Sequence, residues 1–380
     1  MTEHLRNPTS PKTDLLCVDL FSGAGGLSLA AQNAGLVVIA AIEKNKHACV
    51  TYRENLISKG SRTVLYEADI LEINPKDLRS THFNQTSCDI VLGGPPCQGF
   101  STHRINGAGV GDPRNALVLR YFEFVAALRP KVFLMENVPG ILWPRHEKFF
   151  NDFYLLGKKA GYKVIKAVVL DARDYGVPQR RKRVFVLGVR EDFEFKGVWP
   201  PQPTHVRVKP ASETSKLETW TPASQVFVKA IKPSDVNGIH MNHTADMVAV
   251  FKSTPLNGGS RHQSDRVLPC HEEHTGHKDV YGRIDPSVPG PTMTTACINP
   301  SKGRFVHPTE HHGITVRHAA RFQTFPDNFI FHGGLTAAGQ QIGNAVPVLL
   351  GEVLLREVAT GIRNGSLVAA PKKNGQRKTM

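Results

Sequence analysis

The chain has 380 residues, with 47 Lys and Arg against 33 Asp and Glu, so its formal net charge is +14. Hydrophobic residues make up 40% and charged residues 21%, which is typical of a globular protein and excludes a disordered chain. No run of about 18 apolar residues is present, which excludes a helical membrane span. The first residues lack the apolar stretch of a secretory signal. The excess positive charge favours a polyanionic partner, most simply nucleic acid.

The cysteines and the charges are unevenly spread. The six cysteines lack the spacing of a disulfide scaffold, so we expect a reduced, cytoplasmic protein. Residues 156–183 hold nine basic and two acidic residues and continue into the apolar strand at 184–189, so we expect this run to line a site as one surface. If Lys158 or Lys159 faces phosphate, replacing it should weaken binding to any nucleic acid. Residues 189–316 are nearly neutral but hold ten of the 17 histidines.

The first 190 residues alternate between strand and helix patterns. Apolar runs predict strands at 15–20, 36–42, 89–92, 131–135, 164–170 and 184–189. Helical patterns lie between them at 27–34, 46–56, 116–128 and 146–160. This alternation predicts an α/β fold with a largely parallel sheet covered on both faces, and such sheets bind ligands beyond the carboxyl ends of their strands.

The texture changes from about residue 191, where frequent prolines break any long periodicity. A helix-then-sheet texture returns near 316–322 and 347–362. We therefore predict a first domain at 1–188, a smaller loop-rich domain at 189–316, and a return segment at 317–380 with a basic tail from about 371.

A glycine-rich turn at 22–26 follows the first strand. Glycines let backbone amides approach a ligand, so either nucleoside binding or a plain tight turn fits. Ser28 stands where the dinucleotide fingerprint needs glycine. Glu43 follows the second strand and suits ribose hydroxyls, and Asp69 suits an adenine amino group. Because no phosphate-binding Gly-Lys-Ser/Thr is nearby, a nucleoside without phosphates fits better.

Cys97 follows the rigid pair Pro95-Pro96 and precedes a second glycine-rich stretch. A lone cysteine is ordinarily a small buried residue. Prolines stiffen the approach, however, and the loop beyond favours exposure. This combination favours a fixed, accessible nucleophile.

These two segments resemble motifs I and IV of the DNA cytosine-5 methyltransferase family. Four more family motifs follow in order, at 136–138 (Glu-Asn-Val), 179–183 (Gln-x-Arg-x-Arg), 317–327 (motif IX) and 341–347 (motif X). The resemblance implies a Rossmann-like S-adenosylmethionine-dependent methyltransferase sheet with a target recognition domain at 189–316. It also implies a bacterial type II modification enzyme that acts on double-stranded DNA and is paired with a restriction endonuclease.

The resemblance also implies roles for the catalytic residues. Cys97 would attack C6 of a flipped-out cytosine, and Glu136 would hold N3 and the amino group. Arg183 would contact O2 of the base, and Arg181 would steady the Cys97 loop and nearby backbone. No side chain is an evident base for the C5 proton.

The cofactor pocket implied by the family is drawn from both ends of the chain, and consists of Phe21, Gly23, Gly25, Leu27, Glu43, Asp69, Ile70, Asn344 and Ala345. Three residues depart from the family pattern. Lys44 replaces a large apolar residue, His318 a glutamate, and Gly339 a tyrosine, which puts local packing in question but not the reaction.

Two groups of residues are candidates for DNA contact. Gln98, Ser101 and Arg114 lie in the stretch that would close over the base. Arg261, Arg283 and Arg304 could pair with guanine, although a phosphate contact or a solvated position also fits each. The histidine-rich stretch 270–277 lacks zinc-ligand spacing, so we expect no metal.

Three alternatives remain open. A transfer-RNA cytosine-5 methyltransferase of the same fold would differ only in substrate, although the long middle segment favours DNA. An orphan regulatory DNA methyltransferase would lack the nuclease. A non-catalytic DNA-binding protein would keep the fold, but Cys97, Glu136, Arg181 and Arg183 argue against it. We expect a monomer.

Overall fold

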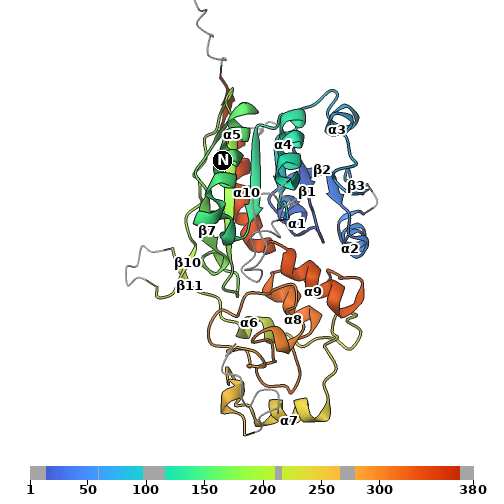
Figure 1. The fold of residues 1–380 in the computed structure, drawn as a ribbon, viewed down its shortest axis with the longest axis vertical. Helices are drawn as coiled ribbons and strands as arrows, with labels where there is room; N and C mark the ends of the chain where they lie inside the picture. The colour runs from blue at the N-terminus through green and yellow to red at the C-terminus, as the bar shows by residue number, and fades with distance from the viewer. Residues whose placement is uncertain (1–13, 59, 97–115, 210–215, 266–278, 369–380) are drawn as a thin grey trace, which may run out of the picture.

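The computed structural model describes residues 14–58, 60–96, 116–209, 216–265 and 279–368. The molecule has two lobes (Figure 1): a sheet lobe with helices packed on a central sheet, and a second lobe of loops and short helices that carries α6 and α7. No helix within these residues is long and apolar enough to cross a bilayer.

The central sheet has eight strands in the order β3-β2-β1-β4-β5-β8-β6, with β7 also paired to β8. The strands are β1 (Leu15–Leu20), β2 (Leu36–Glu43), β3 (Val64–Glu67), β4 (Ile90–Gly93), β5 (Val132–Asn137), β6 (Tyr162–Val164), β7 (Val168–Asp171) and β8 (Lys182–Arg190). The five strands from β3 to β5 are parallel, and β6, β7 and β8 are antiparallel to their neighbours. The sheet is therefore mostly parallel, as expected, but the strand predicted at 164–170 is two strands.

The helices are α1 (Gly26–Asn33), α2 (Lys46–Leu56), α3 (Pro75–His82), α4 (Ala116–Leu128), α5 (Glu147–Lys159), α6 (Ser224–Phe227), α7 (Ala245–Ser253), α8 (Val316–Phe322), α9 (Gly334–Asn344) and α10 (Val348–Arg363). Short strands complete the chain: β9 (Phe193–Glu194), β10 (His205–Val206), β11 (Glu218–Thr219) and β12 (Ser366–Leu367). The predicted helices agree with α1, α2, α4 and α5 to within a residue or two at each end, and the two later ranges expected to have a helix-then-sheet texture are both helices, α8 and α10.

Alternating side chains of β1 pack on opposite faces of the sheet. Leu15 and Cys17 belong to one apolar cluster, together with residues of α1, α2 and α10. Leu16 and Val18 belong to a second cluster with residues of α3, α4 and α5. The result is a three-layer arrangement, and the first cluster continues into the second lobe through Phe322 of α8.

The strand order places a ligand site at one edge of the sheet. β1 lies between β2 and β4, so the chain order reverses there, and ligands bind at such a point outside the carboxyl ends of the strands. We call this edge, where Phe21, Glu43, Gly94 and Glu136 lie, the carboxyl edge. Because β8 runs antiparallel to β5, its first residues also reach the carboxyl edge.

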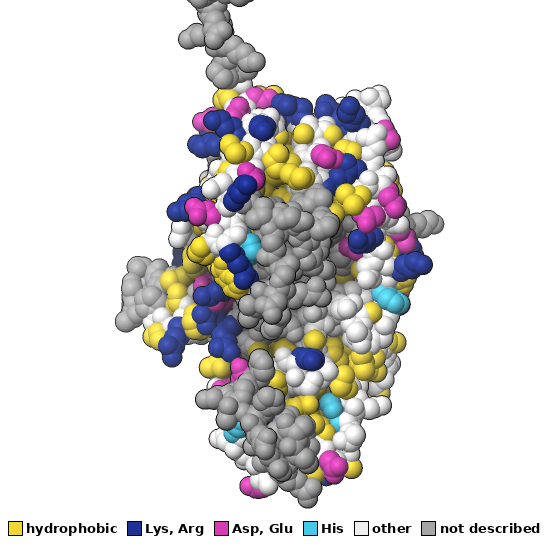
Figure 2. Space-filling view, viewed as in Figure 1, with side chains coloured by type: hydrophobic (Ala, Val, Ile, Leu, Met, Phe, Trp, Pro, Cys, Tyr) yellow, Lys and Arg dark blue, Asp and Glu magenta, His cyan; other side chains and the backbone are white. Residues whose placement is uncertain are grey.

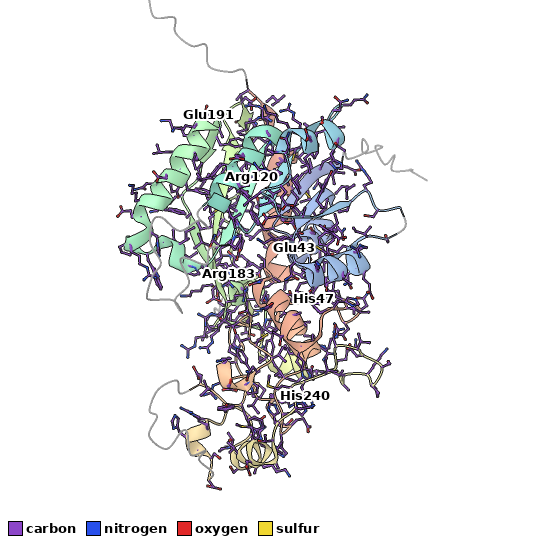
Figure 3. All side chains as sticks on the ribbon, turned by 45° about the vertical axis from the view of Figure 1, so that its right-hand side comes forward. Glu43, His47, Arg120, Arg183, Glu191 and His240 are labelled. Carbon is purple, nitrogen blue, oxygen red and sulfur yellow. The ribbon has the colours of Figure 1, made fainter. Side chains whose placement is uncertain are left out.

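The opposite edge, here called the amino edge, holds the first part of the basic run. β6 pairs with the last residues of β8, and Val189 of β8 pairs with Val132 at the start of β5. Lys158 and Lys159 close α5 just before β6, so they lie near the amino edge. Figure 3 shows that edge at Glu191, far from Arg183. Placing the basic run 156–183 as one surface leading into the site was therefore wrong.

Residues just after the predicted domain boundary at 188 still pack on the sheet lobe. β9 pairs with β12, and the Lys196 amide donates to the Gly361 carbonyl of α10, so contacts with the sheet lobe continue past residue 188. Lys and Arg side chains follow the left side of the face in Figure 2, toward the region of β10 and β11 in Figure 1.

Candidate active site

An ion pair stands at the carboxyl edge where β5 meets β8. Glu136 is opposite Phe185 in the antiparallel ladder, which brings the Arg183 side chain to it. Arg183 Nε lies 2.9 Å from Glu136 Oε1, and the two side chains are only 13% and 11% exposed. Burial raises the pKa of Glu136, while the nearby Arg183 and Arg181 oppose that rise. The carboxyl group can therefore hold a proton closer to neutral pH than an exposed glutamate can.

The loop that leads to Cys97 begins against this pair. Asn137 Nδ2 donates to the Pro95 carbonyl at 3.1 Å, which ties the end of β5 to the loop after β4. A Cβ on Gly94 would lie 3.0 Å from Glu136 Oε2, so glycine allows the close approach. Sequence reasoning quoted Asn137 within its motif but gave it no role. Cys97 itself lies outside the described residues, as do Gln98, Ser101 and Arg114.

The glycine-rich turn after β1 adopts left-handed backbone conformations. Phe21, Gly23 and Gly25 have φ of 59°, 56° and 93°. A Cβ on Gly25 would lie 2.2 Å from Leu56, so that position requires glycine, whereas one on Gly23 would meet nothing within 4 Å. The Gly23 amide donates to Glu43 Oε2 at 2.8 Å. The structure therefore brings the turn and the expected ribose-binding carboxylate together.

A buried polar chain lies at the root of this turn. Tyr52 donates to Ser28 at 2.8 Å, and Ser28 donates to Asp19 Oδ2 at 2.6 Å. Asp19 is 1% exposed, and its Oδ1 has no hydrogen-bond partner in the part of the chain that the structure describes. Burial raises the pKa of Asp19 to about 7. The sequence analysis did not predict that Asp19 belongs to a buried polar chain. The signal that could have indicated it is an acidic residue near the end of an apolar strand.

Asp69, the second carboxylate of the expected pocket, is paired with Lys44. Lys44 Nζ lies 3.0 Å from Asp69 Oδ2, and Asp69 Oδ1 accepts from the Leu71 amide. The Leu71 hydrogen bond and then Lys44 lower the pKa of Asp69. The neighbouring Ile70 is buried. Lys44, a departure from the family pattern, thus has a partner at this end of the pocket.

The far end of the chain closes on the same turn. A Cβ on Gly26 would lie 3.0 Å from the Val346 carbonyl and 3.3 Å from Ala345, so the start of α1 abuts the residues after α9. Leu27, which follows, is buried, and Asn344 is the last residue of α9. Expected cofactor residues from the two ends of the chain, Gly25 and Leu27 on one side and Ala345 on the other, therefore lie close together.

Arg181 binds main-chain carbonyls of two distant segments. It is fully buried, and its guanidinium donates to the carbonyls of Met293, Gly343 and Ala345 at 2.6 to 3.0 Å. Its expected contact with the Cys97 loop stays a prediction, because residues 97–115 lie outside the described residues. The described start of that loop is bound by Asn137.

Arg283, expected to read guanine, is a structural residue of the second lobe. It is fully buried, and its five N–H donors face four main-chain carbonyls and His311. No donor is left for a base, so that expectation was wrong. Arg304 donates to the Gly258 carbonyl and pairs with Asp279, and Arg261 is buried. Their base contacts stay predictions.

His318, which stands where the motif commonly has glutamate, completes the N-terminal cap of α8. Thr315 caps α8, and the His318 ring returns the hydrogen bond by accepting from the Thr315 amide. Burial lowers the pKa of His318 to about 3, so the ring is neutral and its nitrogen can accept. Within the described ranges, no three His, Cys, Asp or Glu side chains are arranged to hold a metal, and the 270–277 stretch lies outside them.

Comparison with known proteins gives consistent relatives. The model of the family described as C-5 cytosine-specific DNA methylase matches residues 15–360. Type II methyltransferase M1.HphI of Haemophilus parahaemolyticus is 33% identical over 348 residues, 90% of this chain and 86% of the relative. Type II methyltransferase M.DdeI of Desulfomicrobium norvegicum is 32% identical over 394 residues, 92% and 90% of the two chains.

Solved structures share the same architecture. A putative DNA modification methyltransferase encoded within an E. coli prophage is 26% identical, with a TM-score of 0.66 over 92% of this chain and all of that one. The S. pombe Dnmt2 methyltransferase, at 18% identity and a TM-score of 0.58 over 92% and 99% of the chains, shares the fold alone. Because the family match runs through both lobes and all the site residues described above, the chain belongs to the C-5 cytosine-specific DNA methylase family and is a DNA cytosine-5-methyltransferase.

Proposed function

We propose that this enzyme methylates C5 of a cytosine flipped out of a specific double-stranded DNA sequence, through a covalent bond between Cys97 and C6. The observation that carries the proposal is the buried Glu136–Arg183 pair, which stands beside the loop leading to Cys97 at the edge where such sheets bind ligands. A flipped base is required because the target atom lies inside the stacked duplex, and flipping costs a few kcal/mol.

The chain's own residues activate the base. The Cys97 thiolate adds its electron pair to C6, while the protonated Glu136 donates its proton toward N3, so that electron density accumulates at C5. Arg183, held beside Glu136, donates to O2 of the same base. After methylation a base removes the C5 proton, the C5–C6 double bond re-forms and the thiolate leaves.

The raised pKa of Glu136 suits this task. Burial favours its neutral form, and the neutral carboxyl is the form that can donate to N3. Arg183 prevents the pKa from rising so far that the proton could not be given up. A general acid is most effective when its pKa lies near the working pH.

The turn after β1 fits S-adenosylmethionine, which when bound supplies an electrophilic methyl group on a sulfonium. Three features support this cofactor: the unpaired buried oxygen of Asp19, which suits a cationic ligand; the open space at Gly23; and Glu43 beside it for ribose hydroxyls. Phe21 and Ile70 would contact the adenine ring, Asp69 its amino group, and Asn344 with Ala345 would close the pocket.

The second lobe would read the DNA sequence, with the chain divided at about residues 188 and 316. The relatives are type II methyltransferases, so we also propose that the enzyme protects its host's DNA from a partner restriction endonuclease, acts as a monomer and is found with the DNA in the cytoplasm.

The test is transfer of a labelled methyl group from S-adenosylmethionine to duplex plasmid DNA, with bulk transfer RNA assayed in parallel. We expect label in DNA only, and none from Cys97→Ser. Bisulfite sequencing of plasmid recovered from expressing cells then maps the site. Label in transfer RNA alone, or equal transfer by Cys97→Ser, would contradict the proposal.

A further inference from the structure

Three fully buried polar side chains, Gln179, Arg181 and Gln323, form a continuous cluster, here called the junction cluster. Gln179 Nε2 donates to Gln323 Oε1 at 2.9 Å. Gln323 Nε2 donates to the Ala345 carbonyl at 2.9 Å, and Arg181 donates to the same carbonyl at 3.0 Å. Gln323 and Arg181 therefore both bind one residue of the expected cofactor pocket, and Gln179 is joined to them through Gln323.

The junction cluster also holds a segment of the second lobe. Gln179 Oε1 accepts from the Met293 amide at 2.7 Å, and Arg181 donates to the Met293 carbonyl at 2.7 Å. Both main-chain polar groups of Met293 are thus bound by residues that directly precede β8. Arg183, which pairs with Glu136, lies two residues further along that same segment.

Backbone contacts around the junction cluster are unusually close. A Cβ on Gly343 would lie 2.3 Å from the main chain of Thr294 and Thr295. A Cβ on Gly290 would lie 2.5 Å from Phe322, and Gly290 exchanges main-chain hydrogen bonds with Pro178 and Arg180. With no room between them, the segment after α9 and the 290–295 segment cannot shift independently.

We propose that the junction cluster couples the cofactor site to the DNA-binding lobe, so that cofactor and DNA strengthen each other's binding. This inference rests on the proposed function, because it takes residues 343–345 as cofactor residues and the second lobe as the DNA reader. An occupied pocket fixes the segment after α9, and this fixes Met293 directly through Arg181 and indirectly through Gln323 and Gln179. Coupling of this kind is reciprocal and typically amounts to 5- to 150-fold in affinity.

The first experiment measures DNA affinity of the full chain with and without S-adenosylhomocysteine, the reaction product, on a duplex carrying the mapped site. We expect about tenfold tighter DNA binding with the product present. Gln323→Met, which keeps the side chain's length but removes its hydrogen bonds, should lower that ratio severalfold, because Arg181 is then the remaining bridge of the junction cluster between Ala345 and Met293. Gln341→Met is the matched control, because Gln341 is also buried in this region but donates away from the cluster to the His332 carbonyl; it should retain the coupling.

A folded Gln323→Met that keeps the wild-type ratio overturns the proposal. So does a wild-type ratio of one in a protein that binds both ligands and methylates DNA. A wild-type protein that binds no S-adenosylhomocysteine and transfers no methyl group contradicts the proposed function itself, so the two failures are distinguishable.

Hydrogen exchange on the wild-type protein keeps the test independent of variant folding. S-adenosylhomocysteine without DNA should slow exchange in peptides covering 290–295 as well as in those covering 21–27 and 343–345. Protection confined to the latter two segments would overturn the coupling.

Discussion

The two lobes use different interactions to fix their backbones. In the sheet lobe, strand pairing satisfies the main chain, and apolar side chains fill both faces. In the second lobe regular elements are few, and arginine side chains bind main-chain carbonyls instead: Arg283 holds Phe251 and Thr254, and Arg321 holds Val226 and Lys229. An arginine in a loop-rich lobe is therefore not by itself evidence for a DNA contact.

The largest expected effect belongs to the sheet lobe. Glu136→Gln keeps the size of the side chain but cannot donate a carboxyl proton, so we expect single-turnover methyl transfer to fall by about 10²- to 10⁴-fold. In the wild-type protein, transfer should decline as pH rises, because the protonated form of Glu136 acts and burial raises its pKa. Glu123→Gln, an exposed change on α4, should leave transfer unchanged. A Glu136→Gln variant within threefold of wild type would remove Glu136 from the mechanism.

The next effect tests the second lobe. Arg283→Met leaves several buried carbonyls without donors, so we expect the free energy of unfolding to fall by about 3 kcal/mol or more in urea titrations. Arg207→Met, an exposed control in the same lobe, should change it by less than about 0.5 kcal/mol. If Arg283→Met were fully stable but methylated additional sequences, Arg283 would be a reader of bases after all.

Asp19 tests the buried polar chain of the sheet lobe through pH. Its folded pKa of about 7 lies above the unfolded value of about 3.9. Between those values the folded state holds the proton and the unfolded state does not, so stability falls as pH rises, by up to about 1.4 kcal/mol per unit. Asp19→Asn should flatten this dependence in urea unfolding between pH 4.5 and 7. An unchanged slope would mean that Asp19 titrates normally.

The smallest effects compare the two edges of the sheet lobe. Arg180 and Lys182 are exposed at the carboxyl edge, whereas Lys158 and Lys159 lie near the amino edge. Replacing Arg180 or Lys182 by alanine should weaken binding to every duplex a few-fold. Each replacement should also reduce the steepness of log affinity against log salt concentration by about one. The Lys158 and Lys159 variants should leave both unchanged in anisotropy titrations. The reverse pattern would restore the amino edge as the DNA surface.

Local sequence patterns predicted the helices and strands whose own apolar residues determine how they are buried. β1, α2 and α4 match their apolar patterns end to end. β3 was missed because its four residues are all at least partly exposed, and α9 because its glycines and glutamines carry little helical pattern. Packing against distant segments determines such elements.

The candidate site likewise has a part that the sequence predicts and a part that it does not. The carboxylates at strand ends were predictable, because parallel strands present their carboxyl ends at one edge. The partners were not: the Lys44–Asp69 pair and the junction cluster join residues 25 to over 160 positions apart. Only the folded arrangement distinguishes Arg183, paired with a carboxylate, from Arg181, paired with carbonyls.

The most direct test of the account uses duplex DNA with 5-fluorocytosine at the mapped site, incubated with the enzyme and S-adenosylmethionine. Fluorine cannot be removed as the C5 proton is, so the thiolate cannot leave. We predict a complex that survives a denaturing gel, with the adduct on Cys97 by mass spectrometry and none from Cys97→Ser. Methyl transfer to ordinary cytosine without any such complex would contradict the covalent mechanism.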